Sequence, residues 1–360
     1  MYSCGLVLEG GGNRAIYTSG VLDAFMDQGI TFPYVIGVSA GSCNAVSYIG
    51  KCRGRQRDIS IQYSGDKRFM SLENMIKNGE FLNGEWLFGE LSYDLSPLDQ
   101  EAYDRANTTL CVVVTNALTG KAEYMYPKDF HKRGCPILRA SCALPGATKG
   151  VVLGKDRYFD GGVTDSIPLA HAYEDGCQKA VVVLTQDRNY QKQPMGHARL
   201  IRRIFRKYPL MTRAILNRYK IYNRQLEAVW DAQGRGDAFV IAPDHPLHCP
   251  TLERNTDKLE QIYQTGYRNA MEQMDALKAF FSQAVSFYRN QIKMPDRPFC
   301  GLSGNKIPCM PSGTQGIFVC YFAFTAAAWA KPSLASPCGV ISTVSPFCSS
   351  STCIQSVTRI

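Results

Sequence analysis

The sequence predicts an α/β protein in which a mostly parallel central sheet is flanked by helices. Apolar, strand-like runs alternate with stretches of helical periodicity, starting with a strand at 5–8, a helix at 13–28 and a second strand that runs from Tyr34 to Ser39. A glycine loop follows the first strand and a serine turn follows the second. Because the order strand, helix, strand, helix implies parallel strands, we expect a βαβα unit at the start of the chain.

The composition is that of a folded protein with a substantial core. Hydrophobic residues make up 45% of the 360 residues, which suits one large domain or one domain with an appendage. The formal net charge of +9 allows nucleic acid, an anionic membrane surface or acidic substrates as partners, and it does not choose among them.

The cysteines and the amino terminus bear on the compartment. The chain has 14 scattered cysteines without paired C-x-x-C spacing, and Cys4, Cys43, Cys111 and Cys177 lie in or beside apolar runs, which favours buried free thiols. The first residues lack the basic region of a signal peptide. We therefore expect a cytoplasmic protein in a reducing compartment.

The remaining elements follow from the same patterns. Residues 51–90 are polar, aromatic and punctuated by glycine, which indicates short helices and loops that form a lid or wall. Ser96, followed by Pro97 and Asp99, predicts the N-cap of a helix. Strands are expected at 110–116, 121–126, 151–153, 158–159, 180–184 and 238–241, and helices at 135–143, 168–174 and 256–288.

The loop Gly10-Gly11-Gly12 has three interpretations. With Ala15 it matches a loose dinucleotide fingerprint, but the second strand lacks the acidic residue that would hold a ribose. The glycines could instead only permit a sharp turn. In the third interpretation their backbone amides converge on an anion and form an oxyanion hole beside the turn after the second strand.

That second turn has the pattern Gly37-x-Ser39-x-Gly41 of a nucleophile elbow, which leaves a serine hydroxyl projecting at a helix N-terminus. A serine nucleophile needs a base, and the five histidines all lie outside recognisable strand-end motifs. Asp160 follows an aromatic strand and precedes two glycines. It is either a turn residue that bonds its own backbone or a functional carboxylate.

Together, three motifs give a specific resemblance. Gly-Gly-Gly-x-Arg ending in Arg14, Gly-x-Ser-x-Gly around Ser39, and Asp160-Gly-Gly occur in the order and approximate spacing of the patatin-like phospholipases. The resemblance covers residues 4–283 and implies a three-layer fold with a Ser-Asp dyad, in which Ser39 is the nucleophile and Asp160 its base. It further implies an oxyanion hole formed by the amides of Gly10, Gly11 and Gly12.

For Arg14 the alternatives are orientation of the loop, binding of a substrate phosphate, and a plain surface ion pair. The family often has glycine where this chain has Ala15, and Asp-Gly-Gly replaces the Asp-Gly-Ala of the plant enzymes. The resemblance implies no cofactor, and we expect no metal.

The resemblance implies a lipid acyl hydrolase of the phospholipase A, lysophospholipase or esterase type, acting on phospholipid or other fatty acyl esters. The alternatives are a lipid acyltransferase that uses the same dyad and a non-catalytic lipid-binding regulator. Residues 199–224 are basic with interleaved apolar residues, which fits either peripheral contact with an anionic membrane or a solvated surface helix. Nucleic acid is not expected, because no stacking platform accompanies the charge.

The domain organisation is predicted from composition. We expect residues 1–285 to form the phospholipase-like domain and residues 286–360 to be an irregular tail without an assigned function. Asp296 is the last acidic residue, and the apolar run 317–330 is shorter than the roughly 20 residues of a spanning helix.

Overall fold

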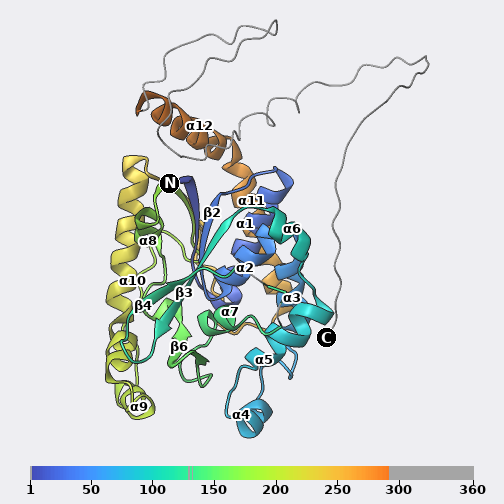
Figure 1. Ribbon diagram of the computed structural model, residues 1–360, viewed down its shortest axis with the longest axis vertical. Coiled ribbons are helices and arrows are strands. Elements are labelled where there is room, and N and C mark those ends of the chain that lie inside the picture. The colour runs from blue at the N-terminus through green and yellow to red at the C-terminus, as the bar shows by residue number, and fades with distance from the viewer. Residues whose placement is uncertain (1, 129, 132, 292–360) are drawn as a thin grey trace, which may run out of the picture. The chain divides into compact units, whose positions relative to one another are not determined.

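The computed structural model describes residues 2–128, 130–131 and 133–291 (Figure 1). Of the predicted tail 286–360, residues 286–291 continue a helix, and the remainder lies outside the described residues. The boundary at 285 therefore stays a prediction.

An eight-stranded sheet forms the middle layer, with the strand order β5-β6-β3-β2-β1-β7-β8 and with β4 also paired to β3. The strands are β1 (Tyr2–Leu8), β2 (Tyr34–Val38), β3 (Thr109–Asn116), β4 (Ala122–Met125), β5 (Val151–Leu153), β6 (Asp156–Asp160), β7 (Cys177–Val183) and β8 (Ala238–Ile241). Pairing is parallel from β3 through β2, β1 and β7 to β8, and antiparallel among β4, β3, β6 and β5. The predicted parallel opening unit is confirmed.

Helices cover both faces of this sheet. They are α1 (Ile16–Asp27), α2 (Ala40–Ile49), α3 (Arg55–Tyr63), α4 (Leu72–Asn78), α5 (Gly84–Trp86), α6 (Gln100–Arg105), α7 (Pro136–Ser141), α8 (Leu169–Glu174), α9 (Ala198–Ile204), α10 (Pro209–Arg235), α11 (Thr256–Glu272) and α12 (Met274–Gln291). Single turns η1 (Gly12–Ala15) and η3 (Gly161–Val163) and a π-helix, η2 (Leu87–Leu95), complete the described elements.

The strands divide their side chains between two cores. Leu6 and Leu8 of β1 pack in a cluster with α1, α2 and α11, whereas Val7 points to the opposite cluster with α8 and α10. Figure 1 shows these two groups of helices on either side of the sheet. Because successive strand residues face opposite sides, the middle of each central strand is apolar on both faces. The three-layer α/β prediction is confirmed.

Two helix predictions were wrong. Ser96 is not an N-cap: its N–H donates to the Leu91 carbonyl at 2.8 Å and closes η2, while Asp99 caps α6 by accepting from the Ala102 N–H at 2.8 Å. The single helix expected at 256–288 is two helices, because α11 ends at Glu272 and α12 starts at Met274.

In the part of the chain that the structure describes, no helix is both long and apolar enough to cross a membrane.

Helices α1 and α11 cross in direct backbone contact. A Cβ placed on Gly20 would lie 2.1 Å from the Tyr263 carbonyl oxygen, and one on Gly266 would lie 2.0 Å from the Tyr17 carbonyl oxygen. Tyr263 also donates a hydrogen bond to Asp23 at 2.8 Å. The crossing anchors α1, which continues directly from the glycine loop.

We predict that Gly266→Ala lowers the free energy of unfolding by about 1–3 kcal/mol, because the added methyl group forces the two helices apart. Gly234→Ala is the matched control, since Gly234 lies in α10 with nothing within 4 Å of an added Cβ, and it should be neutral or stabilising by up to about 1 kcal/mol. Urea unfolding measures both. Equal effects of the two substitutions would contradict the crossing geometry.

Candidate active site

Ser39 occupies a strained turn between β2 and α2. Its φ is 53° and its ψ is −126°, a conformation that is costly for a residue with a side chain. The turn packs tightly: a Cβ on Gly37 would lie 2.7 Å from the Ser42 Cα, and one on Gly41 would lie 2.6 Å from the Leu8 carbonyl oxygen. The glycines of the motif thus allow the turn and its packing against the end of β1.

Hydrogen bonds fix the backbone of this turn. The Ser39 N–H donates to the Ser141 hydroxyl at 2.9 Å, and that hydroxyl donates to the Val113 carbonyl of β3 at 2.7 Å. The Ser39 carbonyl accepts from the Ser42 N–H at 2.9 Å and from the Ser42 hydroxyl at 2.6 Å. These bonds hold the main chain, and the Ser39 hydroxyl faces the Asp160 carboxyl.

Asp160 lies at the end of β6 and is 4% exposed. Its N–H donates to the Ala143 carbonyl at 2.9 Å, and its carbonyl accepts from the Thr115 hydroxyl at 2.9 Å. Its Oδ1 accepts from the Gly162 N–H at 2.7 Å, which is the local turn bond considered for it from sequence. The structure therefore brings together Ser39 and Asp160, which are 121 residues apart in the sequence.

Burial dominates the electrostatics of Asp160 and raises the pKa of its carboxyl above the usual range. The Ser39 hydroxyl, the positive charge of Arg218 and the Gly162 N–H act in the opposite direction and lower that pKa. A carboxylate with a raised pKa is a better proton acceptor than one at the surface of a protein. This arrangement can accept a proton from the serine hydroxyl.

The glycine loop lies beside this pair. A Cβ on Gly10 would lie 3.3 Å from the Ser39 Cβ, and Gly12 lines the same cavity as Ser39. Among the described residues, none accepts a hydrogen bond from the amides of Gly10, Gly11 or Gly12. These donors are thus available to an anion next to the serine.

Glu9 immediately precedes the loop and was missed from sequence. It is 2% exposed and accepts hydrogen bonds from the Thr185 N–H and from the Tyr222 hydroxyl, both at 2.6 Å. Burial raises the pKa of its carboxyl, whereas the Arg14 charge lowers it. A carboxylate between a buried strand and a glycine loop is the signal that could have identified this residue.

Arg14 does not line the cavity that contains Ser39. Its Nη1 donates to the Cys249 carbonyl at 3.2 Å, and its charge acts on Glu9. This placement favours the interpretation in which Arg14 orients the loop. A phosphate-binding role stays a prediction.

An apolar cavity of about 150 Å³ adjoins Ser39. The segment 51–90 supplies much of its wall, as predicted, through the side chains of Ile59, Tyr63, Leu82, Leu87 and Phe88. Cys43 and Cys142 also line it, with their sulfur atoms 3.6 Å apart, and the hydrogen bond from Cys142 lowers the pKa of Cys43. The cavity suits an aliphatic chain better than a polar ligand.

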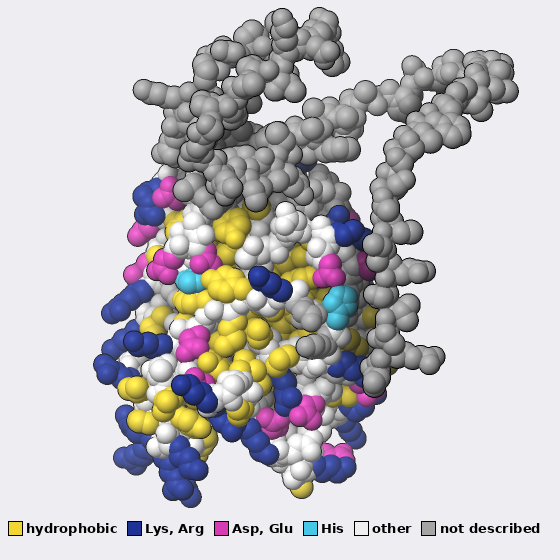
Figure 2. Space-filling view, viewed as in Figure 1, with side chains coloured by type: hydrophobic (Ala, Val, Ile, Leu, Met, Phe, Trp, Pro, Cys, Tyr) yellow, Lys and Arg dark blue, Asp and Glu magenta, His cyan; other side chains and the backbone are white. Residues whose placement is uncertain are grey.

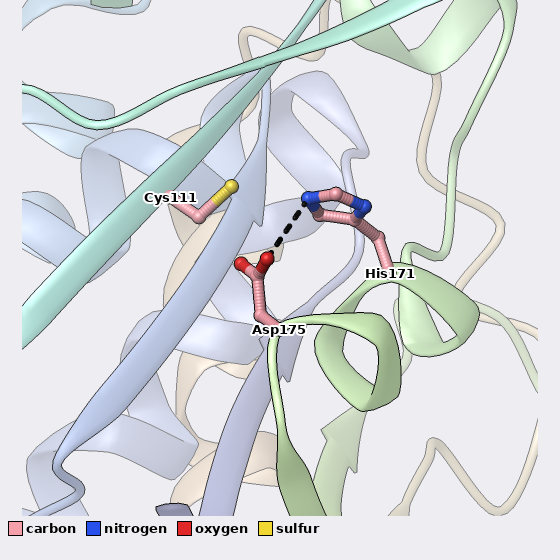
Figure 3. Close-up of side chains that lie close together, drawn as sticks. All are labelled: Cys111, His171 and Asp175. Atoms are coloured by element: carbon pink, nitrogen blue, oxygen red, sulfur yellow. Dashed lines mark ion pairs between the residues drawn. The ribbon is translucent and has the colours of Figure 1, made fainter. Parts of the chain in front are cut away.

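A second cluster of polar side chains lies on the face of the sheet that α8 and α10 cover (Figure 3). Potential metal-ligand atoms of Cys111, His171 and Asp175 lie within 4.8 Å of one another. Tyr34 and Tyr126 already donate hydrogen bonds to Asp175 at 2.6 and 2.7 Å, and burial raises the pKa of the Cys111 thiol to about 12. A metal ion would have to displace these bonds and deprotonate the thiol, so the residues fit a hydrogen-bonded tyrosine cluster better than a metal site.

The comparison with protein families divides the chain in two. Residues 6–173 match the patatin-like phospholipase family, and residues 208–282 match a domain of unknown function (DUF6363). The first match contains the glycine loop, Ser39 and Asp160, and the second contains all of α10 and α11.

The chain is also similar to individual proteins. It is 28% identical over 269 residues to the uncharacterized protein YjjU of Escherichia coli, covering 72% of this chain and 74% of that protein. It is 27% and 24% identical to the lysophospholipases NTE1 of Debaryomyces hansenii and Kluyveromyces lactis, over 50% and 73% of this chain. The aligned regions span only 12% and 18% of those two proteins.

Among solved structures, VipD from Legionella pneumophila aligns with a TM-score of 0.39 and 12% identity, covering 76% of this chain and 66% of that one.

We predict that Asp160→Asn raises the free energy of unfolding at neutral pH. The folded-state pKa of Asp160 is raised, so ionising this carboxyl destabilises the fold increasingly as the pH rises above the ordinary aspartate value. The asparagine variant lacks this effect, so its advantage should disappear as the pH falls toward about 4.

Asp27→Asn is the matched control with the opposite sign. The Arg53 guanidinium lowers the pKa of Asp27, so this carboxylate stabilises the fold at neutral pH and loses that effect in acid. Urea unfolding of both variants between about pH 4 and pH 8 tests the prediction. A neutral-pH loss of stability in Asp160→Asn would show that the buried carboxylate is compensated by its partners.

Proposed function

Residues 6–173 of this chain belong to the patatin-like phospholipase family, and from this premise we propose that the protein is a lipid acyl hydrolase. It cleaves fatty acyl esters of phospholipids or lysophospholipids with Ser39 as nucleophile and Asp160 as base. One observation carries the proposal: the Ser39 hydroxyl faces the buried Asp160 carboxyl beside the glycine loop and at the edge of an apolar cavity.

In the first step, Ser39 Oγ attacks the acyl carbonyl while Asp160 accepts its proton. The tetrahedral oxyanion is stabilised by the amides of Gly10, Gly11 and Gly12, which are fixed donors at the start of a helix. Asp160 then returns the proton to the departing alcohol, and an acyl-serine forms. In the second step Asp160 takes a proton from water as the water oxygen attacks the acyl-serine. When the bond from the acyl carbon to Ser39 Oγ breaks, Asp160 gives that proton to Oγ, the fatty acid leaves and the free enzyme is restored.

The cavity supports an acyl chain as the group that is bound. Its walls are mainly aliphatic and aromatic side chains from α3, η2 and the segment after α7. Burial of methylene groups in such a cavity contributes about 0.8 kcal/mol each. The polar head of the lipid would stay outside it.

We predict that Ser39→Ala and Asp160→Asn each reduce hydrolysis of a p-nitrophenyl acyl ester by about 10³-fold or more, because nucleophile and base act as a unit. Ser39→Ala should also lose labelling by a fluorophosphonate probe. Ser282→Ala is the control, since Ser282 is exposed on α12 and its hydroxyl donates to the Lys278 carbonyl of its own helix at 3.1 Å.

The outcomes separate the alternatives. Failure of the probe to label folded wild-type protein would favour a non-catalytic lipid-binding regulator. Labelling without release of free fatty acid, but with transfer of the acyl group to an added alcohol, would favour an acyltransferase. Undiminished turnover by Ser39→Ala would contradict both enzyme proposals.

The surface around α9 supports contact with an anionic membrane. Leu200 and Ile204 are 55% and 53% exposed. They lie among four exposed arginines of the same segment, Arg199, Arg202, Arg203 and Arg206. Figure 2 shows Lys and Arg side chains gathered with hydrophobic ones at the lower left, where Figure 1 places α9.

Helix α4 adds a second exposed apolar surface at the lower end of the molecule in Figure 1. Leu72 and Ile76 are 74% and 84% exposed. The chain on either side of this helix contributes Phe69 and Leu82 to the cavity wall. Insertion of α4 and α9 into a lipid surface would bring the cavity close to its substrate.

We predict that replacing Arg202, Arg203 and Arg206 with glutamine weakens binding to phosphatidylserine-containing vesicles by about 100-fold at low salt, at ~1 kcal/mol per charge. Binding of the wild type should also weaken as the salt concentration rises. The control replaces three exposed arginines elsewhere, Arg105, Arg254 and Arg268. Equal losses in both triple variants, measured by vesicle sedimentation, would indicate a general charge effect and contradict this surface.

A further inference from the structure

Helix α10 turns a row of polar side chains toward the candidate active site. Arg218, Tyr222 and Gln225 are spaced at i, i+4 and i+7, so they lie along one side of the helix. All three contact the site, whereas Arg213, Lys220 and Arg224 of the same helix are exposed. The row belongs to the segment 208–282, for which no function is assigned.

Arg218 contacts the turn that follows Asp160. Its Nε donates a hydrogen bond to the Gly162 carbonyl, and the Gly162 N–H donates to Asp160 Oδ1 at 2.7 Å. One residue of the turn therefore links the guanidinium to the carboxyl. Arg218 also acts directly on Asp160 through its positive charge.

Gln225 fixes the far side of the same turn. Its Oε1 accepts from the Ser166 and Ile167 N–H groups at 3.2 and 3.3 Å, and its Nε2 donates to Asp165 at 2.6 Å. The Ser166 hydroxyl in turn donates to the Gly162 carbonyl at 2.7 Å. The Gly162 carbonyl is thus held from two sides.

Tyr222, between these two residues, reaches the other loop. Its hydroxyl donates to Glu9 Oε1 at 2.6 Å, and Glu9 Oε2 accepts from the Thr185 N–H. Glu9 connects β1 to the glycine loop. A single row of side chains on α10 therefore contacts both the turn that follows Asp160 and Glu9, the residue that precedes the glycine loop.

We propose that α10 is a positioning element for both loops and that Arg218 is the positioning residue for the Asp160 carboxyl. The inference rests on the proposed function. In it, the nucleophile, the base and the oxyanion donors come from residues 6–173, and the segment 208–282 sets their relative placement. Arg218 does not line the cavity, so it acts through Asp160 and not on the acyl chain.

Other titratable groups lie near Arg218 and Asp160, and their effects on the pH profile must be distinguished from the effect of Asp160. The charges of Glu9, Arg14 and Arg218 act on Lys192, whose pKa burial lowers to about 8, and Cys43 and Cys142 respond to the Asp160 charge. Lys192 would therefore affect the alkaline side of a pH profile. Glu9, like Asp160, has a raised pKa and would affect the acid side.

The test is the pH dependence of kcat/KM for ester hydrolysis by Arg218→Gln, Arg218→Lys and Arg224→Gln. Loss of the positive charge favours protonated Asp160, so the acid limb of Arg218→Gln should move up by about one pH unit. The lysine variant keeps the charge and should restore most of the limb. Arg224, exposed on the same helix, is the control and should leave the profile unchanged.

KM should change little in Arg218→Gln, because the acyl cavity is intact. The pH profile of Glu9→Gln identifies which carboxyl produces the acid limb. If the carboxyl is that of Asp160, the acid limb remains in this variant. A profile of Arg218→Gln that superimposes on the wild type would overturn the proposal, as would equal shifts in Arg218→Gln and Arg224→Gln. If Arg218→Gln fails to fold, the double-mutant cycle described next, which uses the lysine variant, decides the proposal.

A double-mutant cycle of Arg218→Lys and Asp160→Asn, read in the free energy of unfolding at neutral pH, gives a measurement independent of turnover. Non-additive effects are expected, and additive effects would contradict the contact through Gly162. Absence of Ser39-dependent hydrolysis in the wild type would overturn the proposed function, whereas the cycle would still decide whether Arg218 and Asp160 are coupled.

Discussion

The site depends on how closely β1 and β2 approach each other at their carboxyl ends. Gly41 packs against the Leu8 carbonyl, and Gly10 packs against the Cβ of Ser39. Because the two strands are parallel neighbours, the loops that follow them leave the sheet at the same edge. The sheet itself therefore sets the separation between the serine hydroxyl and the amides of the glycine loop, and a side chain in place of either glycine would change it.

The carboxylate reaches this edge from the antiparallel part of the sheet. Asp160 pairs with Val114 of β3, and the neighbouring Val113 carbonyl accepts the Ser141 hydroxyl that holds the Ser39 N–H. The strand β3 thus links the turn at Ser39 to the turn at Asp160. Removal of the carboxyl from water raises its basicity but destabilises its ionised form, so the fold must supply compensating groups around it. The Gly162 N–H and Arg218 are two of them.

The parts of the fold that were predictable from sequence are those whose signals are local. The turn at Ser39, the glycine loop and the buried strands each depend on residue types within a short window. The N-cap of α6 was mispredicted because serine and aspartate are both favourable N-cap residues. The Ser96 N–H bonds the Leu91 carbonyl at the end of η2, so Ser96 belongs to that helix and Asp99 caps α6. No local sequence pattern predicts that the preceding π-helix extends to Leu95.

The basic stretch 199–224 shows why the rest could not be predicted. By composition it is one surface rich in arginine, yet Arg202 and Arg203 face solvent whereas Arg218 faces the Asp160 turn. Helical spacing places Arg218 on a different side of α10 from Arg213, Lys220 and Arg224. Only the packing of α10 against β8 and η3 decides which side is buried. Positive charge therefore has two separate consequences in adjacent turns of chain. In the proposed membrane contact, the charge on α9 acts through water, where salt screens it. On α10 the charge of Arg218 acts at short range on the buried Asp160 carboxylate, where screening is weak.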